Sequence, residues 1–180
     1  MRQARWLAAG LAASVLLVPA ADAAKKKPPY KTDAFYTGST NQGKVCHGVT
    51  DAEDDEGQPC SAVAIVNADR TAELSIKFRA PCDDGFSWAD SFLSDAAQIT
   101  GSRFRTSYDA TRSYSSGASA RFQASGEGVF KRSKKGKYSA SGRLDVIVDY
   151  TPATGETMRC RVPVGWSAKF KDRLPSSGAA

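Results

Sequence analysis

Apolar residues recur at every second position over long stretches of this chain, and that alternation limits the fold more than any other feature. In the first stretch the apolar side consists of Leu74, Ile76, Phe78, Ala80 and Cys82. Residues 138–150 and 159–170 alternate in the same way. A period of two is typical of a β-strand with one face buried and one in water, as in antiparallel sheets.

Shorter alternating runs lie between turn signals. We predict these weaker strands over 34–37, 44–49, 61–66, 97–100, 104–108, 120–124 and 128–132. Glycines between the runs, Gly126 among them, are interpreted as turns, and Ser91–Ala97 would form at most a turn or two of helix. The sequence therefore predicts an all-β fold, a single antiparallel β-sandwich domain of about nine to ten strands.

The N-terminus has the pattern of a bacterial-type secretory signal peptide. Arg2 and Arg5 precede an uncharged apolar run, and Ala21-Asp22-Ala23 supplies small residues for cleavage. The apolar run is shorter than the ~20 residues that span a bilayer. We therefore expect a signal peptide over 1–23, no integral membrane segment after its removal, and a protein that is secreted or held in the periplasm or cell envelope.

Four cysteines in an exported chain indicate a disulfide-stapled domain. Cys82 and Cys160 both fall on the apolar side of a long alternating strand, so both should point into the core, where they could meet. This pairing leaves Cys46 with Cys60, which bracket an acidic loop. The chain has no C-x-x-C and one histidine, so the spacing is not that of a zinc site.

The two ends of the exported chain differ in composition from its middle. Residues 24–31 read AKKKPPYK, a basic proline-containing linker that we expect to be extended and mobile. The β-sandwich domain should occupy residues 32–171. Residues 172–180, which end in LPSSGAA, should form a disordered tail.

The strongest functional signal is a basic cluster between two predicted strands, where a hairpin tip is expected. Its cations are Lys131, Arg132, Lys134, Lys135 and Lys137. Cations on a protruding turn would attract anionic envelope polymers, with an affinity that falls as salt rises. The alternative interpretation is a solvated turn that discourages edge pairing. The neighbouring aromatic residues fit the core phase, so we expect no nucleic-acid partner.

Catalytic patterns are weak. His47, the only histidine, lacks a nucleophile and an orienting acid nearby in the sequence. The stretch 85–89, GFSWA, matches a nucleophile elbow only loosely. Asp83 and Asp84 are typical of a turn. Asp145 and Asp149 share the wet face of one strand without a second catalytic feature beside them. We therefore predict no catalytic residue.

The acidic run 51–57, DAEDDEG, is the one candidate for a cation site. Its glycine comes one place late for an EF-hand loop, and no glutamate closes the loop. Such blocks of like charge are usually solvated, and this interpretation is the one we favour. The sequence therefore predicts no metal site and no cofactor.

Several short motifs, in their order along the chain, resemble an uncharacterised family of small secreted bacterial β-sandwich proteins without an assigned function. The motifs are Tyr36-Thr37-Gly38-x-Thr40-x-Gln42-Gly43, Lys77-Phe78-x-x-x-Cys82, Gly126-x-Gly128-x-Phe130, Gly142-x-Leu144 and, after Cys160, Trp166-x-Ala168. The resemblance implies a β-sandwich and a Cys82–Cys160 bridge, and it implies no activity. Cys46, Cys60 and the insert between them depart from the family pattern.

The function expected from the sequence is that of an exported, non-enzymatic module that binds an envelope polymer or a protein. The formal net charge of +6 agrees with an anionic partner. Two alternatives stay open. One is a carbohydrate-active hydrolase whose carboxylates converge from different strands. The other is a secreted inhibitor that presents the Cys46–Cys60 loop.

Overall fold

The structure is a computed structural model that describes residues 27–43, 46 and 60–174. These residues form nine β-strands and no helix. The strands are β1 (Ala34–Thr40), β2 (Ser61–Val66), β3 (Thr71–Pro81), β4 (Ser87–Leu93), β5 (Ala97–Gln98), β6 (Arg103–Ser113), β7 (Ser119–Arg132), β8 (Tyr138–Thr151) and β9 (Met158–Arg173). The predicted all-β, antiparallel fold is confirmed.

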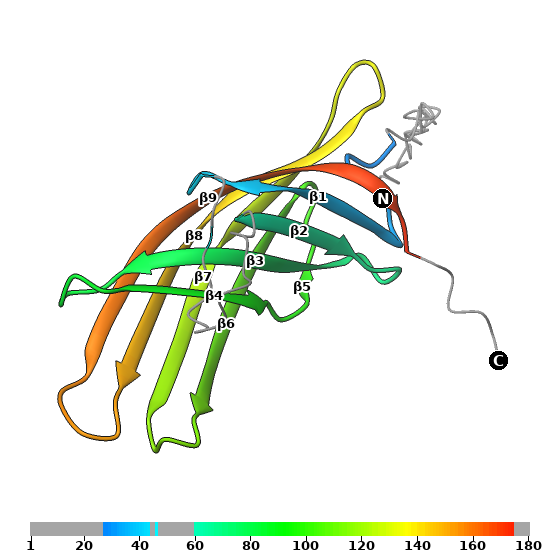
Figure 1. Ribbon diagram of the computed structural model, residues 1–180. Helices are drawn as coiled ribbons and strands as arrows, with labels where there is room; N and C mark the ends of the chain where they lie inside the picture. Colours follow the sequence, from blue (N-terminus) through cyan, green and yellow to red (C-terminus); the bar gives the residue numbers. More distant parts are fainter. Residues whose placement is uncertain (1–26, 44–45, 47–59, 175–180) are drawn as a thin grey trace, which may run out of the picture.

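All nine strands belong to one antiparallel sheet. Its hydrogen-bonded order is β4-β3-β2-β1-β9-β8-β7-β6, and β5 pairs with β3. A sandwich would have two separate sheets, but β1 and β9 pair from Ala34↔Arg173 to Thr40↔Trp166 and join the halves into one. The sheet curls into a half-barrel, so that β2, β3 and β4 lie across β6 to β9 (Figure 1).

The two edge strands of the curled sheet, β4 and β6, approach each other and are joined mainly through side chains. Arg112 donates to the Asp90 carboxylate at 2.8 Å, and the Phe92 ring stacks on Tyr108 with centroids 5.1 Å apart. After β4, the Asp95 backbone N–H donates to the Ser107 carbonyl at 3.3 Å. Contacts of this kind cover the edges against pairing with another chain.

The core lies on the inner face of the curl. The alternating residues of β3 that were predicted to be buried are fully inaccessible at Leu74, Ile76, Phe78 and Ala80. Phe104, Phe122 and Phe130 cover them from β6 and β7. The period of two is therefore confirmed as the pattern of a sheet with one dry face.

Two sequence predictions about local structure are wrong. Gly126 is not a turn, because β7 continues through it as one strand and pairs with β8 along its whole length. Ser91 lies in β4 and not in a helical turn. Trp88, Asp90 and Phe92 all lie on the side of β4 that faces the core and β6. The alternation of this strand was hidden because its middle residue, Asp90, is charged and is paired there with Arg112.

Two glycines, Gly128 in β7 and Gly142 in β8, lie where large inner side chains come close to the backbone. A Cβ on Gly142 would lie 2.8 Å from Trp166 Nε1, and a Cβ on Gly128 would meet the Phe104 ring. Phe104, Gly128, Gly142 and Trp166 occupy matching positions on four neighbouring strands. Gly128 and Gly142, two of the glycines in the motifs behind the family resemblance, thus have a packing role.

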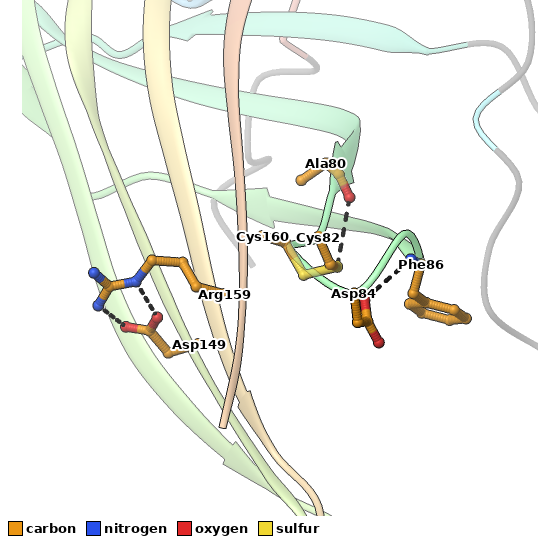
Figure 2. The surroundings of a disulfide bond; sticks show 7 residues. All are labelled: Ala80, Cys82, Asp84, Phe86, Asp149, Arg159 and Cys160. Atoms are coloured by element: carbon orange, nitrogen blue, oxygen red, sulfur yellow. Dashed lines mark hydrogen bonds and ion pairs between the residues drawn. A yellow bond between two sulfur atoms is a disulfide. The ribbon is translucent and has the colours of Figure 1, made fainter. Parts of the chain in front are cut away.

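Both hypothesised disulfides are present. Cys82, just after β3, is joined to Cys160 in β9, with Cα atoms 3.8 Å apart (Figure 2). This bond links strands that are not neighbours in the sheet, because β2 and β1 lie between them. Cys46 is joined to Cys60, and the acidic run between them lies outside the described residues.

The fold includes residues on both sides of the predicted 32–171 domain. Tyr30, which the sequence placed in the linker, is only 8% exposed and packs on Phe130. Strand β9 continues to Arg173. The predicted signal peptide and residues 175–180 lie outside the described residues. Across the part of the chain that is described, no helix is long and apolar enough to cross a membrane.

Candidate functional site

The basic hairpin, residues 131–137, connects β7 to β8. Its tip is closed by two backbone hydrogen bonds, from Ser133 N–H to the Lys137 carbonyl and from Gly136 N–H to the Ser133 carbonyl, both 2.9 Å. Gly136 adopts a φ of 77°, which glycine tolerates at no steric cost. The hairpin projects beyond the other strands (Figure 1). The prediction that these residues form a hairpin tip is confirmed.

The cations of the basic hairpin face water. Lys131, Arg132, Lys134, Lys135 and Lys137 are all exposed. Within residues 27–43, 46 and 60–174, the ion pairs are Arg112–Asp90, Arg121–Asp109 and Arg159–Asp149, and none includes a cation of the hairpin. The hairpin therefore presents charge that its own domain does not neutralise. A ligand-binding role for these residues stays a prediction.

A small pocket of about 280 Å³ lies at the base of the hairpin. We call it the hairpin-base pocket; its lining residues are Lys27, Pro28, Tyr30, Lys31, Thr32, Asp33, Tyr138 and Arg173. Three of them are cationic and one is a carboxylate. Tyr138 joins the pocket to the hairpin, because it pairs with Arg132 across the strands and the Arg132 guanidinium lies 5.6 Å from its ring centroid.

The N-terminal segment that lines the pocket is fixed to the sheet. The Lys31 backbone N–H donates to the Tyr36 hydroxyl at 3.0 Å, and the Leu174 N–H donates to the Asp33 carbonyl at 2.7 Å. Burial raises the pKa of Tyr36, so the phenol keeps its proton while its oxygen accepts this bond. Asp33 has a φ of 50°, in the left-handed region, where the chain bends into β1.

The Lys31 ammonium is held at the pocket by aromatic rings. It lies 5.4 Å from the centroid of Tyr138 and 5.3 Å from that of Phe170. Cation–π contacts of this kind contribute about 0.5–1 kcal/mol at exposed sites. The pocket therefore has one cation whose position is set by the fold.

Positive charge continues from the hairpin onto the outer face of the sheet. Lys131 is paired with Ser139 in β8, and Ser139 with Lys169 in β9. Lys131 and Lys169 are both exposed. Residues opposite each other on neighbouring strands point to the same face. The two lysines therefore flank one serine and extend the cationic surface below the hairpin.

Three of the weak catalytic candidates, Asp84, Asp149 and Ser87, have structural positions in the fold. Asp84 accepts a hydrogen bond from the Phe86 backbone N–H at 3.0 Å and forms the turn before β4 (Figure 2). Asp149 holds Arg159 at 2.6 Å. Ser87 begins a strand after a hairpin turn, which is not the strand-to-helix position of a nucleophile elbow.

Metal-binding candidates fall mostly outside the described residues, where both His47 and the run 51–57 lie. Among the residues that are described, no three His, Cys, Asp or Glu side chains lie close enough together to hold a metal ion.

The sequence analysis missed one cluster of aromatic and charged side chains, which lies where the edge strands β4 and β6 approach each other. The Trp88 ring lies 5.1 Å from Tyr150 and 5.9 Å from Phe122. The Arg112 guanidinium lies 4.6 Å from the Phe122 centroid while it binds Asp90. An alternation of Trp88 with Phe92 was the available signal. The contacts fill the end of the curled sheet, and we interpret them as a closure of the core.

Comparison of the chain with family models, with curated proteins and with solved structures gave no match. The family resemblance of the motifs therefore stays a prediction. The basic hairpin and the hairpin-base pocket are the features of the described chain that point to a ligand.

Proposed function

We propose that this protein is an exported, non-enzymatic module that binds an anionic polymer of the cell envelope through the basic hairpin. One observation carries the proposal: five exposed cations project on a hairpin and form no ion pair with the described part of the chain. The hairpin-base pocket and Lys169 extend the same positive charge. The two disulfides agree with an oxidising location outside the cytoplasm.

A polymer suits this surface better than a single small anion. Exposed charges separated by more than about 10 Å are screened at 0.1 M salt, so each lysine contributes a modest local attraction. A chain of anions can contact several lysines together and release the counterions that surround it. Binding should therefore be strong at low salt and fall steeply as salt rises.

The hydrolase alternative has less support from the described carboxylates. Asp90, Asp109 and Asp149 each bind an arginine. Two hydrogen bonds from Arg121 hold the pKa of Asp109 below its ordinary range, which is unsuited to a general acid. The loop of the inhibitor alternative lies outside the described residues, so no contact favours it over the hairpin.

The test is sedimentation of the exported chain with purified envelope fractions at low and at high salt. A hairpin triple variant carries Lys134→Ser, Lys135→Ser and Lys137→Ser. A charge-matched control carries Arg79→Ser, Arg103→Ser and Arg161→Ser, three exposed cations on other strands. At about 1 kcal/mol for each of the three lysines near an anionic surface, the hairpin variant should bind roughly a hundredfold more weakly.

Each outcome decides something. Loss of binding in the hairpin variant, with the control unchanged, supports the proposal. Equal loss in both variants would mean that net charge alone drives adsorption, and no binding at low salt would overturn the proposal. Protease treatment of the envelope fraction separates the partner classes, because a polymer survives it and a protein partner does not.

A further inference from the structure

We infer that the hairpin-base pocket is a subsite that receives one acidic sugar unit, a ring bearing a carboxylate or phosphate, of the bound polymer. This inference rests on the proposed function and adds a ligand class and a place for it. The observation behind it is the pairing of cations with aromatic rings and hydrogen-bonding oxygens in one pocket. Such a lining differs from the hairpin tip, which offers charge alone.

The size of the pocket suits one unit and not a longer piece. Its volume of about 280 Å³ falls just below the roughly 300–1,000 Å³ of sites that enclose whole small molecules. A polymer lying along the hairpin could therefore place a single ring there while its neighbours remain outside. The pocket adjoins the hairpin through Tyr138 and Arg132, so one chain can contact both.

The charged groups of the pocket fit the anionic part of such a unit. Lys27, Lys31 and Arg173 line it from the N-terminal segment and from the end of β9. Arg173 is exposed, and its guanidinium can donate two parallel hydrogen bonds to a carboxylate or phosphate. Lys31 adds a positive charge that Tyr138 and Phe170 hold in place.

The remaining groups fit the uncharged part. The Asp33 carboxylate and the Thr32 hydroxyl can accept hydrogen bonds from sugar hydroxyls. Tyr30 and Tyr138 bring aromatic surface, against which the apolar face of a sugar ring can lie. A free inorganic anion would use only the cations, so the mixed lining favours a sugar that carries the anion.

The site is also pre-formed, which lowers the ordering cost of binding. Tyr30 packs on Phe130 in the core with ring centroids 5.6 Å apart. The Lys31 backbone N–H donates a hydrogen bond to the Tyr36 hydroxyl, and the Leu174 N–H donates one to the Asp33 carbonyl. These contacts fix the segment before any ligand arrives.

The experiment is a titration of the exported chain with small probes, followed by the backbone amide signals of Lys31, Asp33 and Tyr138 in NMR. The probes are glucuronic acid, glucose 6-phosphate, glucose and inorganic phosphate. We expect saturable shifts at millimolar concentration with at least one of the two acidic sugars. Glucose and inorganic phosphate should each shift the signals far less. Comparison of glucuronic acid with glucose 6-phosphate shows whether the pocket prefers a carboxylate or a phosphate.

Two exposed positions on β9 supply the variant and its control. Arg173→Gln removes a pocket cation, and Lys171→Gln removes the same charge two residues away, outside the pocket lining. The acidic sugar should bind at least about fivefold more weakly to Arg173→Gln than to Lys171→Gln, a loss typical of one charge-assisted hydrogen bond. Neither side chain forms a core contact, so both variants should fold.

The outcomes separate this inference from the proposed function. If neither acidic sugar binds while the polymer still sediments with the protein, the subsite is overturned and the hairpin function stands. If an acidic sugar binds in the pocket but the polymer is not retained, the hairpin function fails and the pocket stands. Equal shifts with inorganic phosphate would also overturn the inference, because they would show a site for anions in general.

Discussion

The two ends of β7, β8 and β9 both carry cations, but in different surroundings. At the end away from the basic hairpin, Arg121 contacts Asp109 at 2.8 Å and Arg159 contacts Asp149 at 2.6 Å. At the hairpin end, the cross-strand neighbour of Lys131 is Ser139. The sheet therefore pairs Arg121 and Arg159 with acids at one end and places Lys131 beside a serine at the other.

The difference follows from cross-strand register. Asp149 is opposite both Arg121 and Arg159, so one acid lies between two cations. Ser139 occupies the equivalent central position between Lys131 and Lys169. Opposite charges on facing positions stabilise a sheet modestly, and like charges repel. With a serine at the centre, Lys131 and Lys169 have no acid between them, and an external anion can bind there instead.

The largest effect that we expect concerns the end with the ion pairs, where the Cys82–Cys160 bond lies near Asp149 and Arg159 (Figure 2). The bond spans a sequence separation of 78 residues. In the loop-entropy model, losing a bond that closes a loop of this length lowers the free energy of unfolding by about 4.5 kcal/mol. A variant with Cys82→Ala and Cys160→Ala should show this loss in urea denaturation.

The same variant tests whether the two ends act separately. Where it remains folded, its binding to envelope fractions should equal that of the parent chain, because the basic hairpin lies at the other end of the strands. Weaker binding by folded protein would show that the ends are coupled and would break the comparison.

The fold was largely predictable because one face of each long strand is dry. Alternation identified β3, β8 and β9, and it placed Cys82 and Cys160 on the side where they meet. It failed at Gly126, because glycine signals a turn locally, while here it lies inside β7 where a Cβ would meet the backbone of Arg143 and Leu144 in β8. It also could not tell one curled sheet from two, since this depends on the pairing of β1 with β9.

The candidate site was predictable only in part. A run of lysines between two strands is a local signal, and it located the basic hairpin. The hairpin-base pocket has no local signal, because its residues come from the N-terminal segment, from Tyr138 and from Arg173. Tyr30 follows lysines and prolines in a stretch typical of a linker, and only its contact with Phe130 shows that it belongs to the core.

We expect an intermediate effect on binding when an acid is placed between two cations at the hairpin end, as at the end with the ion pairs. Ser139→Asp places a carboxylate between Lys131 and Lys169, as Asp149 lies between Arg121 and Arg159. The new acid should compete with the polymer for both lysines. Envelope binding should weaken several-fold, and the slope of its logarithm against the logarithm of salt concentration should fall by about 1.

Ser139→Asn is the matched control, because it has the same shape without the charge. The converse variant, Asp149→Asn, frees Arg159 at the other end. If location matters as proposed, this variant should leave polymer binding unchanged. A gain in binding equal to the loss in Ser139→Asp would show instead that only net charge counts, and the contrast between the two ends would lose its functional meaning.

The smallest effect concerns pH and the end with the ion pairs. Hydrogen bonds from Arg121, and secondarily from Gln123, hold the pKa of Asp109 below its ordinary value of 3.8. A carboxyl with a lowered pKa in the folded state stabilises the fold above its ordinary pKa and loses that contribution as pH falls through the lowered one. The stability advantage of the parent chain over Asp109→Asn should therefore be constant near pH 7 and shrink below about pH 4.

The hairpin triple variant is the control. It removes no carboxylate contact, so its stability relative to the parent chain should be the same at pH 7 and at pH 3. Urea denaturation of the three proteins at pH 7 and pH 3 measures this difference. An advantage over Asp109→Asn that survives at pH 3 would mean that Asp109 acts through packing, and that the two ends differ in shape more than in charge.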